Sequence, residues 1–254
     1  MAGRDIMHFK EFTLRQEGCG MRISTDGVLL GSWATLHSKD MVSSMPSPLD
    51  PPMIIDVGTG TGLLTLMLAQ RYPSAQLLGV EIEEKASQMA RSNALASPFA
   101  ERISIVRADF AKYVSMLPSH SANLIISNPP FFPSGVATRS QERKQARYTT
   151  TLAPRQLFGW ASRLLKPNGK LAMITPYDQL EALRTAATSD GFVPFRLTAV
   201  ITVEGKAPKR LLSEWIYQHP EAPFCPLTSL TLRTQEGEYS SLSRQLLSPF
   251  YIFL

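Results

Sequence analysis

The sequence predicts an α/β fold built on a doubly wound, mostly parallel β-sheet. Short apolar runs alternate with segments of helical periodicity from residue 53 onward, and a glycine-rich turn follows the first run at residues 56–62. Strands that alternate with helices at this spacing form parallel sheets, because each helix carries the chain back to the start of the next strand. A glycine turn between the first strand and the first helix is a common ligand-binding position in such sheets.

The elements of this pattern are predicted in chain order. Strands are expected at the short apolar runs 53–57, 76–81, 102–107, 123–127 and 170–175. Helices are expected where apolar residues recur at helical spacing, over 63–71, 84–96, 154–166 and 178–189. Two β-rich segments, 195–203 and 211–217, are joined by a turn that holds Gly205 and Pro208, which indicates an antiparallel pair at the end of the sheet.

The chain before this pattern divides into two segments. Residues 1–37 are interpreted as an N-terminal extension, with a hairpin or strand near residues 9–14 and a helix capped by Thr25 or Asp26. Residues 38–52 are rich in Ser and Pro and predict a flexible loop without a chemical role. The remaining residues, 53–254, are then the main domain.

Composition excludes several classes of protein. No apolar run reaches the roughly 20 residues of a membrane helix, and residues 1–10 lack the apolar core of a secretory signal. Cys19 and Cys225 form no CxxC pair, and the four histidines show no metal-ligand spacing, so we expect no disulfide framework and no metal site. These features favour a cytoplasmic protein that is not bound to a membrane.

The turn at residues 56–62 reads D-x-G-x-G-x-G and opens into a helix. Glycines let the backbone approach a ligand closely, and the free N–H groups of a helix N-terminus favour a carboxylate or phosphate. Glu81 ends the second strand, where it can accept hydrogen bonds from a ribose, and Asp109 follows the third, where it can face an adenine amino group. A dinucleotide site would read G-x-G-x-x-G, so S-adenosylmethionine is favoured over NAD, while a purely structural turn stays open. The predicted cofactor residues are Asp56, Gly58, Gly60, Gly62, Glu81, Asp109 and Asn128.

A rigid polar turn follows the fourth strand, where residues 127–132 read Ser-Asn-Pro-Pro-Phe-Phe. Proline fixes φ and holds the preceding Asn128 extended at the strand end. The side-chain oxygen of Asn128 and the carbonyl of Pro129 can accept both hydrogens of a planar NH2 group, and Phe131 offers a ring for stacking. Catalytic residues are therefore predicted at Asn128, Pro129, Pro130 and Phe131. The alternative is a turn that only ends the strand.

Positive charge gathers in two segments. Lys and Arg number 26 against 21 Asp and Glu, a net charge of +5 that permits nucleic-acid binding without proving it. A charge cluster alone is more often a solvated surface, but the segment 139–147 begins seven residues after Phe132. The residues predicted to contact RNA are Arg139, Arg143, Lys144, Arg147, Lys209 and Arg210.

The motifs as a set resemble those of class I S-adenosylmethionine-dependent methyltransferases, which have a Rossmann-like sheet. The resemblance is to the branches of this class that carry an NPP(Y/F) motif. The chain is also similar almost end to end to the tRNA1(Val) (adenine(37)-N6)-methyltransferase family. The segments that carry this similarity are 9–16, 20–34, 54–68, 80–83, 127–132, 237–240 and 248–254. Two departures are a longer link at 38–52 and Pro249, which stands where the family has an acidic residue.

The resemblance implies methyl transfer from S-adenosylmethionine to N6 of adenine 37, beside the anticodon of a valine tRNA. It places the family's cofactor motif on Asp56, Gly58, Gly60 and Gly62, its ribose and adenine positions on Glu81 and Asp109, and its catalytic motif on residues 128–131. It also implies that residues 25–27 lie beside the cofactor pocket. The motif alone leaves other NH2 groups open, such as an rRNA or DNA base or a protein glutamine amide, and so does a non-catalytic cofactor- and RNA-binding module. The sequence predicts no oligomeric state.

Overall fold

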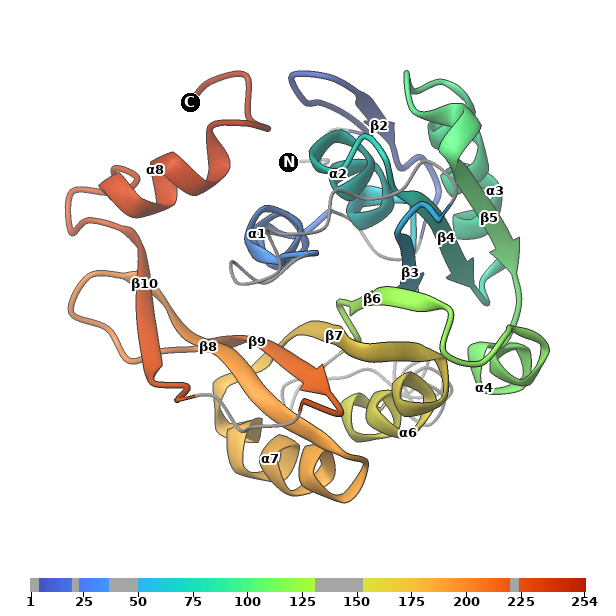
Figure 1. Ribbon diagram of the computed structural model, residues 1–254. Coiled ribbons are helices and arrows are strands. Elements are labelled where there is room, and N and C mark those ends of the chain that lie inside the picture. Colours follow the sequence, from blue (N-terminus) through green and yellow to red (C-terminus); the bar gives the residue numbers. More distant parts are fainter. Residues whose placement is uncertain (1–4, 20–22, 37–49, 131–152, 220–223) are drawn as a thin grey trace, which may run out of the picture.

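The computed structural model describes residues 5–19, 23–36, 50–130, 153–219 and 224–254. The core is an eight-stranded sheet with the strand order β10-β8-β9-β7-β6-β3-β4-β5 (Figure 1). Its parallel part consists of β3 (Met53–Val57), β4 (Gln76–Glu81), β5 (Ile103–Arg107), β6 (Ala122–Ser127) and β7 (Leu165–Pro176). This arrangement confirms the predicted doubly wound, mostly parallel fold.

The antiparallel part of the sheet lies on one side of β7. β9 (Arg210–Tyr217) runs antiparallel to both β7 and β8 (Phe192–Val203), which confirms the predicted antiparallel pair. β10 (Leu227–Arg233) then pairs in parallel with β8 and extends the sheet by one strand that the sequence pattern did not indicate.

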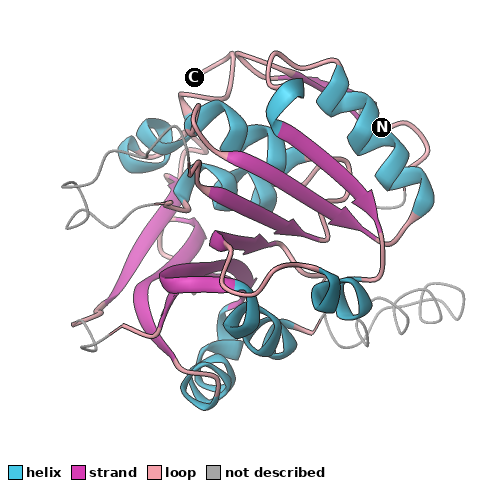
Figure 2. Ribbon diagram, turned by 45° about the vertical axis from the view of Figure 1, so that its right-hand side comes forward, coloured by secondary structure: helices cyan, strands magenta, loops and turns pink. Residues whose placement is uncertain are grey.

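Helices cover both faces of the sheet (Figure 2). α1 (Thr25–Trp33), α2 (Leu63–Arg71) and α8 (Ser241–Leu247) share one hydrophobic cluster with the sheet, while α4 (Phe110–Tyr113), α6 (Pro154–Leu164) and α7 (Leu180–Ser189) share the other. Neighbouring residues of a strand enter opposite clusters: Leu124 and Ile126 pack on the first side and Ile125 on the second. The strands are continuously apolar because both faces are buried.

The remaining elements are short or lie at the edge of the sheet. α3 (Glu84–Leu95) packs against β4 and β5. Three single-turn 3₁₀ segments are Ala100–Arg102, Val114–Met116 and Tyr177–Gln179. None of the helices in the described ranges is long and apolar enough to cross a membrane.

The N-terminal segment is part of the core. β1 (Ile6–His8) and β2 (Thr13–Arg15) form the expected hairpin. α1 follows, and Gly27 through Trp33 are all buried, between the sheet, α2 and α8 (Figure 1). The predicted cap was wrong by one residue, because the side chain of Ser24 accepts the hydrogen bond from the Gly27 N–H. Most of the predicted loop, residues 38–49, lies outside the described residues.

The described segments near the two chain ends lie side by side. Phe9 forms an antiparallel bridge with Tyr251, and their rings stack with centroids 6.0 Å apart. Pro249, the sequence departure near the C-terminus, accepts a hydrogen bond from Gln70 through its carbonyl, and the neighbouring Phe250 is buried. The C-terminal segment is therefore docked on α2 and the hairpin without the acidic residue.

Candidate active site

The predicted site residues meet at one edge of the sheet. β3 is hydrogen-bonded to β4 on one side and β6 on the other, and β4 pairs with β5. All four strands are parallel, so the residues at their carboxyl ends share an edge. The structure thus brings Asp56, Glu81, Asp109 and Asn128 to the same edge although they are spread over more than 70 residues of sequence.

The glycine turn has the backbone conformation that requires glycine. Gly58, Gly60 and Gly62 have φ values of 73°, 58° and 92°, in the left-handed region that other residues rarely adopt. A Cβ added to Gly60 would meet no atom within 4 Å, so the backbone here faces open space. Gly62 is also the N-cap of α2. The turn therefore forms a small cradle with a helix N-terminus at its end.

Asp56 braces this turn from inside. Its Oδ2 atom accepts hydrogen bonds from the Thr59 hydroxyl at 2.6 Å and from the Thr65 hydroxyl and N–H at 2.8 and 3.1 Å. The residue is buried, and burial raises the pKa of its carboxyl to about 6. Within the described residues its Oδ1 atom has no hydrogen-bond partner. One oxygen is thus used by the protein and the other is available to a donor.

Glu81 is tied to the same turn. Its Oε2 atom accepts the Gly60 N–H at 2.9 Å, and its Oε1 atom accepts the Glu83 N–H at 2.9 Å. Burial raises the pKa of this carboxyl as well. Asp109 is half-buried and caps α4, where its Oδ1 accepts the Ala111 N–H at 3.1 Å. Both acidic side chains are held at the sheet edge by backbone N–H groups.

Asn128 follows β6 directly and is half-buried. The preceding Ser127 is buried and donates from its hydroxyl to the Val57 carbonyl at 2.8 Å, which ties the end of β6 to the start of the glycine turn. Pro129 is also buried. Phe131, the predicted stacking ring, lies outside the described residues.

Helix α1 lies against this site through a contact that the sequence did not assign. A Cβ built on Gly27 would lie 3.6 Å from Asn128 Nδ2 and only 2.9 Å from Leu63 Cδ2. Gly27 therefore allows α1 to approach both the amide and the first residue of α2. The resemblance had indicated that residues 25–27 belong near the cofactor, but it assigned them no contacts.

The comparison with known proteins fits this geometry. Residues 36–185 match the family described as Methyltransferase small domain. A tRNA1(Val) (adenine(37)-N6)-methyltransferase of Porphyromonas gingivalis is 44% identical over 97% of this chain and 95% of its own. One of Pectobacterium carotovorum is 37% identical over 99% of this chain and 95% of its own. The chain belongs to the tRNA1(Val) (adenine(37)-N6)-methyltransferase family.

Solved structures place this family member in the methyltransferase fold. A predicted O-methyltransferase of Agrobacterium tumefaciens superimposes with a TM-score of 0.63 at 20% identity and covers 88% of this chain and 96% of its own. P. horikoshii TYW2 in complex with MeSAdo gives a TM-score of 0.54 at 13% identity, over 85% of this chain and 74% of its own. At these identities the likeness concerns the fold alone.

The predicted RNA-contact residues of this tRNA methyltransferase family member fall into two groups. Arg139, Arg143, Lys144 and Arg147 lie outside the described residues. Lys209 is exposed, whereas Arg210 is half-buried and donates from Nε to Asp26 Oδ2 at 2.9 Å. Among the described residues no group of three or more His, Cys, Asp or Glu could hold a metal ion.

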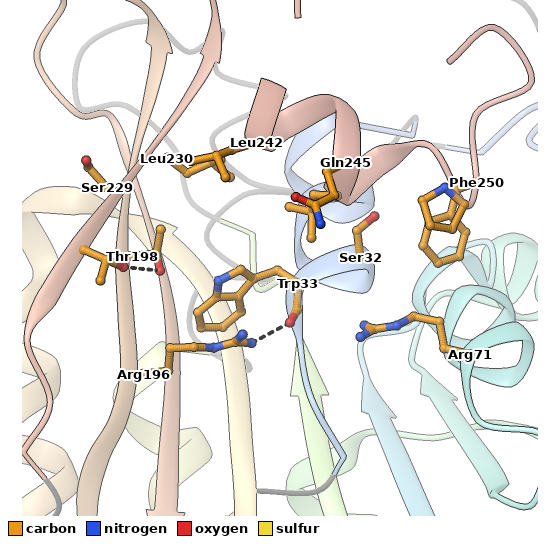
Figure 3. A pocket seen from close by; sticks show the side chains of 13 residues that line it. Ser32, Trp33, Arg71, Arg196, Thr198, Ser229, Leu230, Leu242, Gln245 and Phe250 are labelled. Carbon is orange, nitrogen blue, oxygen red and sulfur yellow. Dashed lines mark hydrogen bonds between the residues drawn. The ribbon is translucent and has the colours of Figure 1, made fainter. Parts of the chain in front are cut away.

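A separate cavity of about 550 Å³ lies between α1, β8, β10 and α8 (Figure 3). It contains none of the predicted cofactor or catalytic residues. Arg71 lines it and donates to the Gly31 and Ala34 carbonyls at 2.8 and 2.6 Å. Arg196 donates to the Trp33 carbonyl, and its guanidinium lies 3.7 Å from the centre of the Trp33 ring. The two arginines satisfy the carbonyls at the C-terminal end of α1, so this cavity belongs to the packing of that helix.

Proposed function

We propose that this chain transfers a methyl group from S-adenosylmethionine to N6 of adenine 37 in tRNA1(Val), the activity for which its relatives are named. The observation that carries the proposal is the hydrogen bond that joins the ends of β6 and β3. The Ser127–Val57 hydrogen bond of 2.8 Å sets Asn128 beside the glycine turn. An amide that can hold a planar NH2 group thus adjoins a cradle for a methyl donor.

The residues at the sheet edge fit S-adenosylmethionine. The open backbone at Gly60 and the N-terminus of α2 suit the methionine carboxylate, and the unpartnered, buried Oδ1 of Asp56 suits a donor such as an ammonium group. Glu81 would accept from the ribose and Asp109 from the adenine amino group, while Gly58, Gly62 and Asn128 complete the predicted set. The sulfonium supplies an activated methyl group when the cofactor is bound.

The protein's own task is to hold the acceptor amine. The lone pair of an adenine N6 is delocalised into the ring, so the nitrogen is a weak nucleophile. When the Asn128 side-chain oxygen and the Pro129 carbonyl accept both N–H bonds, they stabilise the positive charge that develops on nitrogen. Pro130 keeps this turn stiff and Phe131 stacks on the base. N6 would gain the methyl group from the sulfonium, which would be left as a neutral thioether, and the acidic methylated ammonium would lose its proton to water.

The substrate and the cellular setting belong to the same proposal. An anticodon-loop base is single-stranded and can be turned into a pocket at modest cost. The exposed Lys209 and the predicted contacts in residues 139–147 would neutralise backbone phosphates. A tRNA substrate favours the cytoplasm as its location. The chain then divides into an N-terminal segment (1–37) that packs into the core, a loop (38–52) and the rest of the methyltransferase domain (53–254).

The test is methyl acceptance by tRNA. Purified protein, labelled S-adenosylmethionine and bulk tRNA from cells lacking this enzyme should yield N6-methyladenosine in the valine isoacceptor, detected by nucleoside mass spectrometry. Its absence there would remove the specific substrate. RNase that leaves methyl acceptance in an extract unchanged would point to a protein amide.

The role of Asn128 has its own test. Asn128→Ala should lower turnover by about two to three orders of magnitude, the usual effect of removing one positioned group that stabilises developing charge. Affinity for S-adenosylmethionine should stay nearly unchanged. Gln88→Ala, which removes an exposed amide from α3, is the control and should leave turnover as in the wild type. Unchanged turnover in Asn128→Ala would refute the catalytic role and favour a binding module.

A further inference from the structure

One ion pair joins two segments of the chain 184 residues apart. Arg210 Nε lies 2.9 Å from Asp26 Oδ2, and the two side chains are 32% and 21% exposed. Asp26 lies in the first turn of α1, where a negative charge is favourable to the helix. Arg210 is the first residue of β9. The pair therefore ties the start of the N-terminal helix to the turn between β8 and β9.

Both partners lie at the sheet edge that carries Asn128. Arg210 pairs with Pro176 at the carboxyl end of β7, and the neighbouring β6 ends at the residue before Asn128. On the other side of the ion pair, Asp26 precedes Gly27, whose added Cβ would lie 3.6 Å from Asn128 Nδ2. The ion pair thus spans from the wall of the amide site to the β8–β9 turn.

The β8–β9 turn presents its remaining cations to solvent. Lys206 and Lys209 are exposed, and neither forms a salt bridge to any residue in the described part of the chain. The turn keeps its own backbone bonds, because the Lys209 N–H donates to Val200 and its carbonyl accepts from Tyr177. Arg210 points inward to Asp26, while the two lysines are free to meet phosphates.

We propose that the Asp26–Arg210 pair is a positioning device. It fixes the lysine-bearing turn relative to Asn128, so that phosphates bound by Lys206 and Lys209 bring the acceptor base to the amide. Arg210 then acts through Asp26 and is not itself an RNA contact. This inference rests on the proposed methyl transfer to RNA and names the part of the chain that orients the substrate.

The two roles of Arg210 predict opposite results for one variant. Asp26→Asn is nearly isosteric and removes only the charge. If Arg210 acts by position, this change should lower kcat/KM for tRNA about five- to tenfold, within the usual coupling between contacting residues. If Arg210 bound RNA directly, releasing it from Asp26 would strengthen tRNA binding. Titration with S-adenosylmethionine gives both its affinity and the binding stoichiometry. The stoichiometry is the fraction of folded protein, by which the rates are scaled.

The decisive experiment is charge reversal. Arg210→Asp alone should lower kcat/KM for tRNA at least as much as Asp26→Asn, and the combined Asp26→Arg, Arg210→Asp variant should regain most of the loss. Glu181→Gln breaks the exposed Glu181–Arg184 pair of α7, 3.5 Å long, and should behave as the wild type. Single variants with wild-type kinetics, tighter tRNA binding in Asp26→Asn, or a reversed pair no better than Arg210→Asp would each overturn the proposal.

The same assay separates this inference from the proposed function. Wild-type methyl acceptance by tRNA tests the function. The ratio of each variant to the wild type, measured on whichever nucleic acid accepts the methyl group, tests the ion pair.

Discussion

The two ends of α1 are held by different chemistry. At the N-terminal end, Ser24 caps the helix and a partly exposed pair, Asp26 with Arg210, links it to the β8–β9 turn. At the C-terminal end, the buried Glu214 and Lys170 hold the residue that follows the helix, and the half-buried Arg71 and Arg196 hold its carbonyls. The buried end serves the fold, because its charges cannot be left unpaired. The exposed end adjoins Asn128, where small shifts matter to a reaction more than to stability.

The buried end is centred on Glu214. Its carboxylate accepts the Thr35 hydroxyl at 3.0 Å and lies 3.2 Å from Arg196 Nε, and the residue has no exposed side-chain surface. Lys170 donates to the Thr35 hydroxyl at 2.6 Å. Burial lowers the pKa of Lys170 to about 8 and also lowers the pKa of Arg196. Glu214 is therefore the one carboxylate among these contacts that balances the two cations.

Removal of this carboxylate should produce the largest effect on stability. Glu214→Ala leaves the buried Lys170 and the half-buried Arg196 without a counter-charge, which should lower the free energy of unfolding by about 3–5 kcal/mol. Urea unfolding followed by tryptophan fluorescence measures the change. A loss below 1 kcal/mol would mean that water reaches this end of α1, and the contrast between the two ends would fail.

Substitution of two glycines of α1 allows a direct comparison of the two ends of the helix. A Cβ would lie 2.9 Å from Leu63 at Gly27, beside Asn128, and 2.7 Å from the Met67 sulfur at Gly31, one turn further along. Each Gly→Ala change should cost about 1–3 kcal/mol through overpacking, less what alanine gains in helix propensity. Only Gly27→Ala should also lower turnover, by about ten- to a hundredfold, because it displaces the amide.

Gly31→Ala is the matched control for that experiment. It crowds the same helix and tests whether strain in α1 alone slows the reaction. If turnover per folded molecule fell equally in both variants, the effect of Gly27→Ala would come from strain in α1 and not from displacement of Asn128.

The buried lysine should give stability a pH dependence. Burial lowers the pKa of Lys170 from 10.5 to about 8 in the folded protein, so the unfolded chain binds more protons between these values. The free energy of unfolding should therefore rise through that window, by at most about 1.4 kcal/mol per pH unit. Lys170→Met should remove this rise. The free energy of unfolding of both proteins is measured by urea titration from pH 7.5 to 10. If Lys170 stays charged in the folded protein, the two plots of this free energy against pH will be parallel, and the prediction fails.

The elements with local signals were predicted closely. α2 and β4 have the predicted bounds, Leu63–Arg71 and Gln76–Glu81, because apolar periodicity and flanking Gly and Pro define them within a few residues. β10 was missed because Leu227, Thr228 and Ser229 at its start are exposed and give no apolar run. β7 begins at Leu165, five residues before the predicted start, and includes Asn168, which has a φ of 63°.

The candidate site and helix α1 beside it divide in the same way. The glycine turn and the residues around Asn128 are contiguous motifs, so their chemistry can be inferred from spacing. The pairings of Asp26 with Arg210 and of Thr35 with Glu214 join residues 184 and 179 positions apart. Such contacts depend on which strands become neighbours in the sheet, and no local pattern encodes that.

The smallest effect is expected where the exposed end meets solvent. Lys209→Ala removes one cation from the β8–β9 turn but leaves the Asp26–Arg210 pair and the fold intact. KM for tRNA should rise about two- to threefold and the slope of log affinity against log salt should fall by about 1, with kcat unchanged. Lys112→Ala is the charge-matched control, because Lys112 lies on α4, which covers the face of the sheet opposite to α1. It should change neither KM for tRNA nor the salt slope. If Lys209→Ala lowered kcat while the salt slope stayed constant, the turn would act on the reacting base and not through phosphates.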